Sequence, residues 1–213
     1  MNTNNNINLI TILGPTATGK TNLAVRVADH IQSEIISADS RQIYKDMDIG
    51  TGKDLNEYRI DNRSIPYHLI DIINPNEDYS VYSFQRDFHI TYNDILTKNK
   101  CPILCGGTGL YIESVLLNYE MSSIKPDYAL RDKLEKFSKN KLLDMFQELK
   151  DKTPNNWKCD TKQRIIRGIE IALKNNQNIK STKYELDLNK VIVIGIHIDI
   201  EKRKKKIKQR LQY

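Results

Sequence analysis

Gly14-Pro15-Thr16-Ala17-Thr18-Gly19-Lys20-Thr21 is the stretch of sequence that decides the fold of this chain. It matches the pattern of a phosphate-binding loop, in which two spaced glycines are followed by Lys and a hydroxyl side chain. Residues 7–13, just before it, form an apolar and β-branched run that predicts a buried strand. From Lys20 to Ile31 apolar side chains recur at helical spacing. Strand, glycine-rich turn and helix together are the context in which this pattern binds phosphate.

The residue types in this loop suit a phosphate or a diphosphate. Glycines let the backbone wrap closely, successive N–H groups form an anion-binding concavity, and the helix N-terminus adds partial positive charge. The Lys20 ammonium neutralises phosphate charge, and the Thr21 hydroxyl is placed to coordinate Mg²⁺. We therefore predict that all residues from Gly14 to Thr21 bind a diphosphate or nucleotide, with Mg²⁺ as cofactor and Thr21 as its protein ligand. The alternative is a fortuitous glycine-rich turn.

Strand-like and helix-like segments alternate beyond the loop. Further strands are expected at residues 34–38, 68–73, 103–105 and 191–198, and further helices at residues 80–99 and 110–117, with Ser80 as a helix N-cap. This alternation predicts an α/β fold, a P-loop NTPase-like parallel sheet flanked by helices. Such sheets bind ligands at the carboxyl ends of their strands, so we expect Gly14, Asp39 and Gly106 to meet in one crevice.

The composition changes after residue 124, where short charged helices replace the alternation. Helices are expected at residues 131–137, 141–149 and 162–173, with a break at residues 153–156. We predict a P-loop catalytic core at residues 1–124 and a small helical insertion at residues 125–183. Residues 184–213 are expected to return to the core as a strand and the start of a basic helix.

Composition excludes several classes of protein. With 39% hydrophobic and 28% charged residues, the chain has a globular composition and not a disordered one. No apolar run approaches the roughly 18–20 residues that a membrane span needs, and residues 1–6 lack the features of a signal peptide. The three cysteines show no CxxC spacing, which argues against disulfides and structural zinc. We therefore expect a cytoplasmic protein with no membrane partner.

Two polar residues stand at the expected strand ends, and each has more than one interpretation. Asp39 can act as a general base or as a partner of the magnesium, or it can merely cap a helix. Thr108, in the turn formed by residues 106–109 (GGTG), can contact an anionic ligand or act as a plain N-cap. Their position next to the phosphate loop favours the functional interpretation of both.

Basic residues gather in two further places. Arg164 and Arg167 lie three residues apart, which puts them on one face of the predicted helix. The cluster Lys202-Arg203-Lys204-Lys205-Lys206 lies near the end of a chain whose net charge is +6. Both could bind the phosphates of a nucleic acid, and both could equally be solvated helix faces.

Three motifs of this chain resemble one family, the tRNA dimethylallyltransferases, also called tRNA isopentenyltransferases. They are the phosphate loop GPTATGKT, the pair of segments 36–44 (ISADSRQIY) and 47–53 (MDIGTGK), and residues 106–111 (GGTGLY). The middle pair is the most specific. The resemblance runs from about Leu9 to the end of the chain, and it is weaker in the helical insertion.

The resemblance implies transfer of a dimethylallyl group from dimethylallyl diphosphate to N6 of an adenosine next to the anticodon in tRNA. In this family the loop and magnesium hold the diphosphate leaving group. Asp39 then matches the aspartate that accepts the amine proton, Thr108 a ligand-contacting residue, and Arg210 an arginine that helps to bind the diphosphate. The positions that match tRNA-binding residues are Asp39, Ser40, Arg41, Gln42, Arg131, Gln163, Arg164, Ile165, Ile166 and Arg167.

Several alternatives stay open at this point. The same loop and base would serve an isopentenyltransferase acting on AMP, ADP or ATP, a small P-loop kinase, or an inactive RNA-binding remnant. The chain has Ile200 where members of the family often have Arg, and it ends at Tyr213 while they continue well beyond this point. We interpret it as a C-terminally truncated member, either a fragment or a short paralogue, which binds the anticodon arm of tRNA as a monomer.

Overall fold

The computed structural model of the protein describes residues 7–119, 124–152, 157–174 and 186–210. Contacts between Cα atoms divide the chain into two compact units. The core unit comprises residues 1–119 and 184–213, and the helical unit comprises residues 120–183. The sequence-based boundary between core and insertion was placed five residues later, at 124/125 instead of 119/120. None of the helices in the described ranges is long and apolar enough to cross a membrane.

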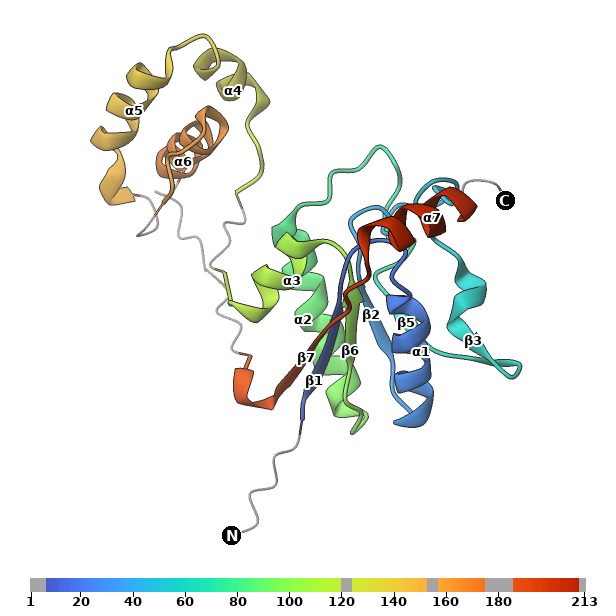
Figure 1. The fold of residues 1–213 in the computed structure, drawn as a ribbon. Helices are drawn as coiled ribbons and strands as arrows, with labels where there is room; N and C mark the ends of the chain where they lie inside the picture. Colours follow the sequence, from blue (N-terminus) through green and yellow to red (C-terminus); the bar gives the residue numbers. More distant parts are fainter. Residues whose placement is uncertain (1–6, 120–123, 153–156, 175–185, 211–213) are drawn as a thin grey trace. The chain divides into compact units, whose positions relative to one another are not determined.

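The core unit is built on a five-stranded sheet with the order β5-β2-β6-β1-β7. Its strands are β1 (Leu9–Leu13), β2 (Ile35–Ala38), β5 (Tyr67–His68), β6 (Ile103–Gly106) and β7 (Val191–Gly195). All neighbouring strands pair in parallel, and Gly106 is in register with both Leu13 and Ala38. The three central strands therefore end at the same level. This parallel sheet confirms the predicted α/β fold (Figure 1).

Helices cover both faces of the sheet. They are α1 (Lys20–His30) on one side and α2 (Val81–Thr97) and α3 (Gly109–Leu116) on the other, and a further helix, α7 (Ile200–Arg210), follows β7. In Figure 1, α2 and α3 lie on one side of the sheet and α1 on the other. Alternate strand residues follow this division, because Ile36 packs in the cluster with Phe84 of α2, and Ile35 packs in the cluster with Val25 of α1. The expected cap of α2 is confirmed, since Ser80 Oγ accepts from Ser83 N at 3.2 Å.

The chain between β2 and α2 departs most from expectation. Residues 68–73 were predicted as one strand, but β5 ends at His68 and only an isolated bridge joins Tyr44 and Ile73. A 3₁₀ turn (Leu55–Tyr58) and a hairpin of β3 (Arg59–Ile60) and β4 (Arg63–Ser64) were not predicted. Strands of two residues are too short to show periodicity. The hairpin turn, Asp61 and Asn62, has the positive φ angles that a tight hairpin requires.

The helical unit consists of α4 (Tyr128–Leu134), α5 (Lys139–Glu148) and α6 (Lys162–Lys174) around an apolar core. Its first two helices begin earlier than predicted because side chains cap them. Asp127 Oδ1 accepts from Leu130 N at 3.0 Å, and Ser138 Oγ accepts from Lys141 N at 3.3 Å. The predicted break at residues 153–156 lies outside the described residues.

A charge cluster holds the sheet together at the end opposite the phosphate loop. Glu34, only 4% exposed, accepts from Lys100 at 2.9 Å and contacts His68 Nε2 at 2.8 Å and Lys98 at 3.3 Å. Burial favours the neutral acid, but these three partners together outweigh it and lower the pKa of Glu34 to about 2. Because the three partners come from different segments, the carboxylate ties β5, the end of α2 and the chain before β6 to β2.

We expect Glu34→Gln to destabilise the core unit by about 3 kcal/mol at neutral pH, the free energy that such a pKa shift represents. The folded-state pKa lies below the unfolded value, so this contribution is present above the unfolded pKa of 4.5 and is lost as the pH falls toward 2. Urea unfolding at a series of pH values measures it, and the two stability curves should converge on acidification. Glu201→Gln is the control, because its carboxylate is 77% exposed beside Lys204. Equal stability of wild type and Glu34→Gln at neutral pH would contradict the prediction.

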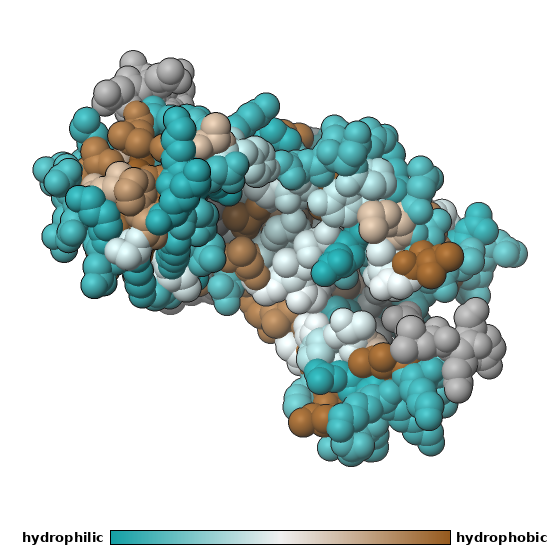
Figure 2. Space-filling model, turned by 90° about the horizontal axis from the view of Figure 1, so that it is seen from above, coloured by the Kyte–Doolittle hydropathy of each residue, from teal (hydrophilic) through white to brown (hydrophobic). Residues whose placement is uncertain are grey.

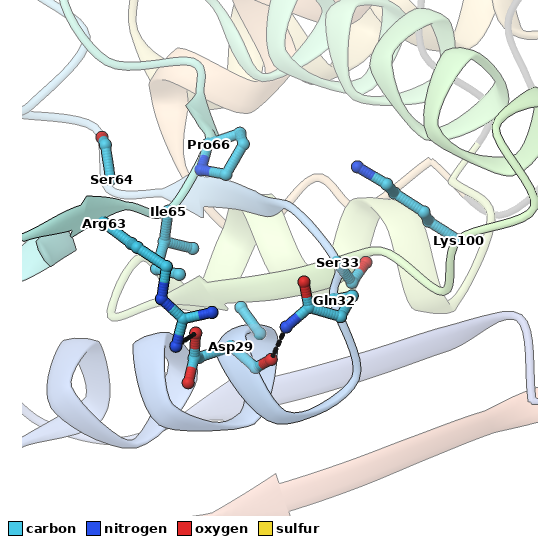
Figure 3. Close-up of a pocket in the computed structure, with 9 residues that line it drawn as sticks. Asp29, Gln32, Ser33, Arg63, Ser64, Ile65, Pro66 and Lys100 are labelled. Carbon is cyan, nitrogen blue, oxygen red and sulfur yellow. Dashed lines mark hydrogen bonds and ion pairs between the residues drawn. The ribbon is translucent and has the colours of Figure 1, made fainter. Parts of the chain in front are cut away.

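A shallow hollow of about 230 Å³ lies at this same end of the sheet (Figure 3). Ser33, Pro66 and Lys100, which line it, precede β2, β5 and β6. In Figure 3 the Arg63 guanidinium reaches Asp29, to which it is bonded at 3.0 Å. The hollow lies at the amino ends of the strands, whereas ligands of parallel sheets bind at the carboxyl ends. We assign it no role.

Candidate diphosphate and acceptor site

Three predicted site segments follow three adjacent strands at one edge of the sheet. The phosphate loop follows β1, Asp39 follows β2, and the turn containing Thr108 follows β6. Thr108 N donates to the Ala38 carbonyl at 3.1 Å, and a Cβ built on Gly107 would lie 3.7 Å from Lys20 Nζ. The predicted meeting of these segments is therefore confirmed.

Figure 2 looks onto this end of the core unit, where the surface is mostly teal or near white and brown patches are scattered.

The phosphate loop has the backbone shape that an anion site needs. Ala17 and Gly19 both have positive φ angles, of 65° and 87°. Gly19 stands at the N-cap position of α1 and offers no side chain, so no cap competes with an anion for the first N–H groups of the helix. Gly14 allows close approach, because a Cβ there would lie only 2.6 Å from the Ile196 carbonyl oxygen.

Lys20 lies folded over its own loop. Its ammonium donates to the Pro15 carbonyl oxygen at 2.7 Å, and Thr18 Oγ1 donates to the same oxygen at 2.8 Å. The positive charge is thus held beside the concavity that the loop encloses. A phosphate bound to the loop amides would lie within reach of this ammonium, which supports the predicted role of Lys20.

The predicted magnesium site has Thr21 as its protein ligand. Within the described ranges no group of three or more His, Cys, Asp or Glu side chains could hold a metal ion. Mg²⁺ keeps several waters and is commonly bound by one or two protein oxygens together with substrate phosphates. A hydroxyl in the first turn of α1, where Thr21 lies, fits that coordination. Thr21 as a magnesium ligand stays a prediction.

Asp39 and Thr108 are linked through the turn that follows β2. Asp39 Oδ1 accepts from Arg41 N at 2.9 Å, so it closes a turn and does not cap a helix. Thr108 occupies the N-cap position of α3 but makes no side-chain cap. Its hydroxyl instead accepts from Ser40 N at 2.9 Å and lies 3.2 Å from Ser40 Oγ. The plain N-cap interpretation is therefore wrong for both residues, and their catalytic roles stay predictions.

Cys105, at the end of β6, lies between the strands that lead to the phosphate loop and to Asp39. Burial is the main cause that raises the pKa of the Cys105 thiol, to about 12. The Lys20 ammonium opposes this rise, and the Asp39 carboxylate adds to it. Because β6 lies between β1 and β2, the phosphate loop and Asp39 follow strands on either side of it.

The residues after Asp39 differ in exposure. Arg41 is exposed, whereas Gln42 is half-buried and its amide lies 3.4 Å from both Ser37 Oγ and the Gly52 carbonyl oxygen. Ser40 uses its backbone N–H and its hydroxyl to hold Thr108. Arg41 is thus the member of this group that projects to solvent, and the assignment of all three to tRNA binding stays a prediction.

In the helical unit, Arg131 and Arg167 hold a buried carboxylate. Glu170, fully buried, accepts from Arg131 Nη2 at 2.8 Å and Nε at 3.2 Å, and also from Arg167 Nη1. Arg167 Nη2 donates to the Ile124 carbonyl at 2.7 Å. Although burial raises the pKa of Glu170, the two guanidiniums and a backbone N–H outweigh it, and the net pKa is lowered. Both arginines therefore have a structural role besides their predicted contact with tRNA.

The segment 163–167 divides between surface and core. Gln163 and Arg164 are exposed, and Arg164 pairs with Asp160 at 2.6 Å. Ile165 and Ile166 are 0% and 3% exposed in the core of the helical unit. The side chains of these two isoleucines pack inward, so Gln163 and Arg164 are the exposed residues of the segment. The tRNA-binding assignment of the segment stays a prediction.

We expect Glu170→Gln to destabilise the helical unit by about 3–5 kcal/mol, because it leaves two half-buried guanidiniums without their carboxylate. Hydrogen exchange measured separately over the two units should show faster exchange in α4 and α6, with the core unit unchanged. Glu135→Gln is the control, since this carboxylate pairs with Lys162 at 3.0 Å and is 47% exposed. Unchanged protection of α6 would show that Glu170 contributes little to the unit.

The last helix bears out the predicted basic segment. α7 spans Ile200–Arg210, and its lysines from Lys202 to Lys208 are exposed. Arg210 is its final residue, and the side chain of Arg210 lies outside the described residues. The predicted contact of Arg210 with the diphosphate is thus not tested by the geometry.

Comparison with known proteins places the chain in a family. Residues 42–213 match the model of the IPP transferase family, and residues 7–65 match a model described as isopentenyl transferase. The chain belongs to the IPP transferase family. It is 47% identical over 207 residues to tRNA dimethylallyltransferase 1 of Parabacteroides distasonis, with 96% of this chain and 66% of that protein covered.

Other relatives support the same family assignment. The chain is 42% identical to tRNA dimethylallyltransferase 1 of Syntrophus aciditrophicus, covering 96% of this chain and 67% of that protein. The crystal structure of a full-length tRNA isopentenylpyrophosphate transferase from Bacillus halodurans matches with a TM-score of 0.61 and 30% identity. That match covers 97% of this chain and 65% of the other. The chain thus spans about two thirds of the length of the curated relatives that it matches.

Lys53, whose side chain is only 1% exposed, has no role among the sequence-based predictions. One signal in the sequence could have indicated a role for this lysine. Lys53 ends a glycine-containing turn, and that turn also carries Asp46 and Asp48. Its partner Asp71 lies 18 residues further along the chain, so no local pattern reveals the pair.

Proposed function

We propose that this IPP transferase transfers a dimethylallyl group from dimethylallyl diphosphate to N6 of an adenosine next to the anticodon in tRNA and releases diphosphate. The observation that carries the proposal is the juxtaposition of the phosphate loop with Asp39. The phosphate loop and the Asp39 carboxylate follow strands that flank β6, and Thr108, which follows β6, is hydrogen-bonded to Ser40 in the turn after Asp39 and to Ala38 at the end of β2. The names of the relatives, which describe transfer of this group to tRNA, support the same chemistry.

The donor would bind through its diphosphate. Loop amides and the Lys20 ammonium would provide positive charge where the leaving diphosphate gathers negative charge, and Thr21 would hold Mg²⁺ beside them. When bound, Mg²⁺ supplies further neutralisation of that charge. The resemblance adds Arg210 to the groups that bind the diphosphate. Held in this way, the donor presents its reactive carbon to the acceptor side of the site.

The acceptor side would supply the base. An exocyclic adenine amine is a poor nucleophile, so a carboxylate that accepts its proton assists the attack. The bond between the allylic carbon and the diphosphate oxygen breaks, a bond from N6 to that carbon forms, and the N6 proton passes to Asp39. The hydrogen bond from Arg41 N occupies one side of the carboxylate and fixes its orientation.

RNA binding would rely on exposed positive charge. The lysines of α7 and the exposed Arg164 of the helical unit can neutralise phosphates of the anticodon arm. Phosphate contacts position an RNA without reading its sequence. Choice of the reacting adenosine therefore has to come from groups near Asp39.

The test is incubation of the protein with dimethylallyl diphosphate, Mg²⁺ and either undermodified tRNA or AMP, followed by mass spectrometry of the nucleosides. We expect N6-dimethylallyladenosine in the tRNA, and much less of it with Lys20→Ala at a donor concentration that does not saturate the variant. Prenylation of AMP alone would instead identify an adenylate isopentenyltransferase, and phosphoryl transfer from ATP would identify a kinase. Binding of tRNA without turnover would leave only an RNA-binding protein.

A further inference from the structure

Lys53 is a charged side chain that the core unit buries. Its ammonium donates to the Tyr44 carbonyl oxygen at 3.0 Å and contacts the carboxylates of Asp48, at 2.7 Å, and Asp71. Burial lowers the pKa of this lysine, but the two carboxylates outweigh it and raise the pKa above its ordinary value. The lysine thus stays charged, and three partners fix it in place.

These partners make Lys53 the clamp of the segment 44–53, which we name the clamp loop. The backbone of the loop is fastened at its start, where Lys45 N donates to the Ile73 carbonyl at 2.8 Å. Its tip is closed by the Thr51 hydroxyl, which donates to the Met47 carbonyl at 2.7 Å. Contacts at its start, tip and end restrain the loop, and such preorganisation lowers the cost of binding a ligand.

The clamp loop belongs to the same strand end as the proposed base. Asp39 directly follows β2, and the clamp loop begins five residues later. The side chain of Gln42 bridges the two, because it lies 3.4 Å from both Ser37 Oγ of β2 and the Gly52 carbonyl oxygen. The clamp loop therefore lies at the carboxyl end of β2, on the acceptor side of the site.

The tip of the clamp loop has an unusual chemistry for a surface expected to meet RNA. Ile49 is 99% exposed and Met47 is 41% exposed. Asp46 and Asp48 carry negative charge there, but Asp48 is paired with the inward-facing Lys53 ammonium at 2.7 Å, and the exposed Lys45 stands next to Asp46. The exposed apolar side chains of such a tip can pack against the uncharged face of a base.

We propose that the clamp loop, held by Lys53, is a preformed contact for the base next to the reacting adenosine, with Ile49 as the contacting side chain. The inference rests on the proposed function. An adenine that reaches Asp39 has to leave its stack, and its neighbour then loses a stacking partner. Apolar side chains commonly take that place. In this role Ile49 touches the RNA and Lys53 is a positioning residue.

The first test compares Ile49→Ser with wild type in steady-state prenyl transfer to an anticodon stem-loop RNA. We expect KM for the RNA to rise about tenfold, within the range for loss of one base contact, while KM for dimethylallyl diphosphate stays unchanged. Ile90→Ser is the matched control, because Ile90 is 61% exposed on α2, away from the strand ends. An RNA KM for Ile49→Ser equal to that of wild type would overturn the proposal.

The second test covers the clamp. Lys53→Met should raise the RNA KM at least as much as Ile49→Ser, and Lys53→Arg should restore part of the loss. A 2-aminopurine placed beside the acceptor adenosine gives a readout that folding alone does not move. Its fluorescence should change on binding to wild type and change much less with Ile49→Ser, which is folded because its side chain is exposed. Equal changes would refute the contact.

The two tests also separate this inference from the proposed function. Absence of prenyl transfer by wild type would contradict the proposed function, and the 2-aminopurine titration would still decide the contact. Normal transfer by wild type with an unaffected Ile49→Ser would contradict only the inference.

Discussion

Asp39→Asn should lower the rate of prenyl transfer by about 10²–10⁴-fold, the contribution typical of a general base, while donor binding stays near that of wild type. The geometry indicates that this substitution removes the base and keeps the surrounding turn. Asp39 Oδ1 accepts from Arg41 N at 2.9 Å, and an asparagine oxygen can accept the same bond. The turn after β2 is therefore kept, along with the link between Ser40 and Thr108. What the variant loses is the ability to take the N6 proton.

The measurement is the turnover number at saturating tRNA and donor, combined with calorimetric titration of the donor. Asp61→Asn is the matched control, because Asp61 lies in the β3–β4 hairpin turn at a φ of 46°, which asparagine tolerates. The control should behave as wild type in both assays. If Asp39→Asn instead loses donor binding and turns over normally once the donor is bound, Asp39 is a partner of the magnesium and not the base.

The parts of the site that the sequence predicts well are those with local causes. The phosphate loop needs only a strand, a turn and a helix that are contiguous, and α1 begins at Lys20 as expected. The cap at Ser80 depends on a residue three positions away. Parallel pairing then brings the three strand ends together without any further information, since the carboxyl ends of such strands share one edge.

The parts that escaped prediction depend on partners far apart in the chain. Arg131 and Glu170 are 39 residues apart, and neither has a local pattern that reveals their pairing. In the segment 163–167 the resemblance could not separate surface from core, although Ile165 and Ile166 are the apolar residues of an amphipathic helix. The burial of Lys53 was not predicted for the same reason as that of Glu170, because tertiary contacts produce it.

The phosphate side of the site can be tested as sharply as the base. Lys20→Ala should weaken binding of dimethylallyl diphosphate by about 10- to 100-fold, which corresponds to loss of a charged hydrogen bond to phosphate. The loop amides are dipoles and cannot replace a full positive charge beside a diphosphate. Thr21→Val should have a different effect, because it removes a magnesium ligand, and a higher Mg²⁺ concentration should then be needed for the same donor affinity.

Calorimetric titration with the donor at several Mg²⁺ concentrations measures both effects and keeps them apart. Lys136→Ala is the control, since Lys136 is exposed in the helical unit and should leave donor binding unchanged. Lys20 also donates to the Pro15 carbonyl at 2.7 Å, so thermal unfolding of the variant has to be measured beside its affinity. A Lys20→Ala protein that is as stable as wild type and binds the donor equally well would place the diphosphate elsewhere. The assignment of the whole loop, from Gly14 to Thr21, would then fall, because its amides and this ammonium enclose one and the same space.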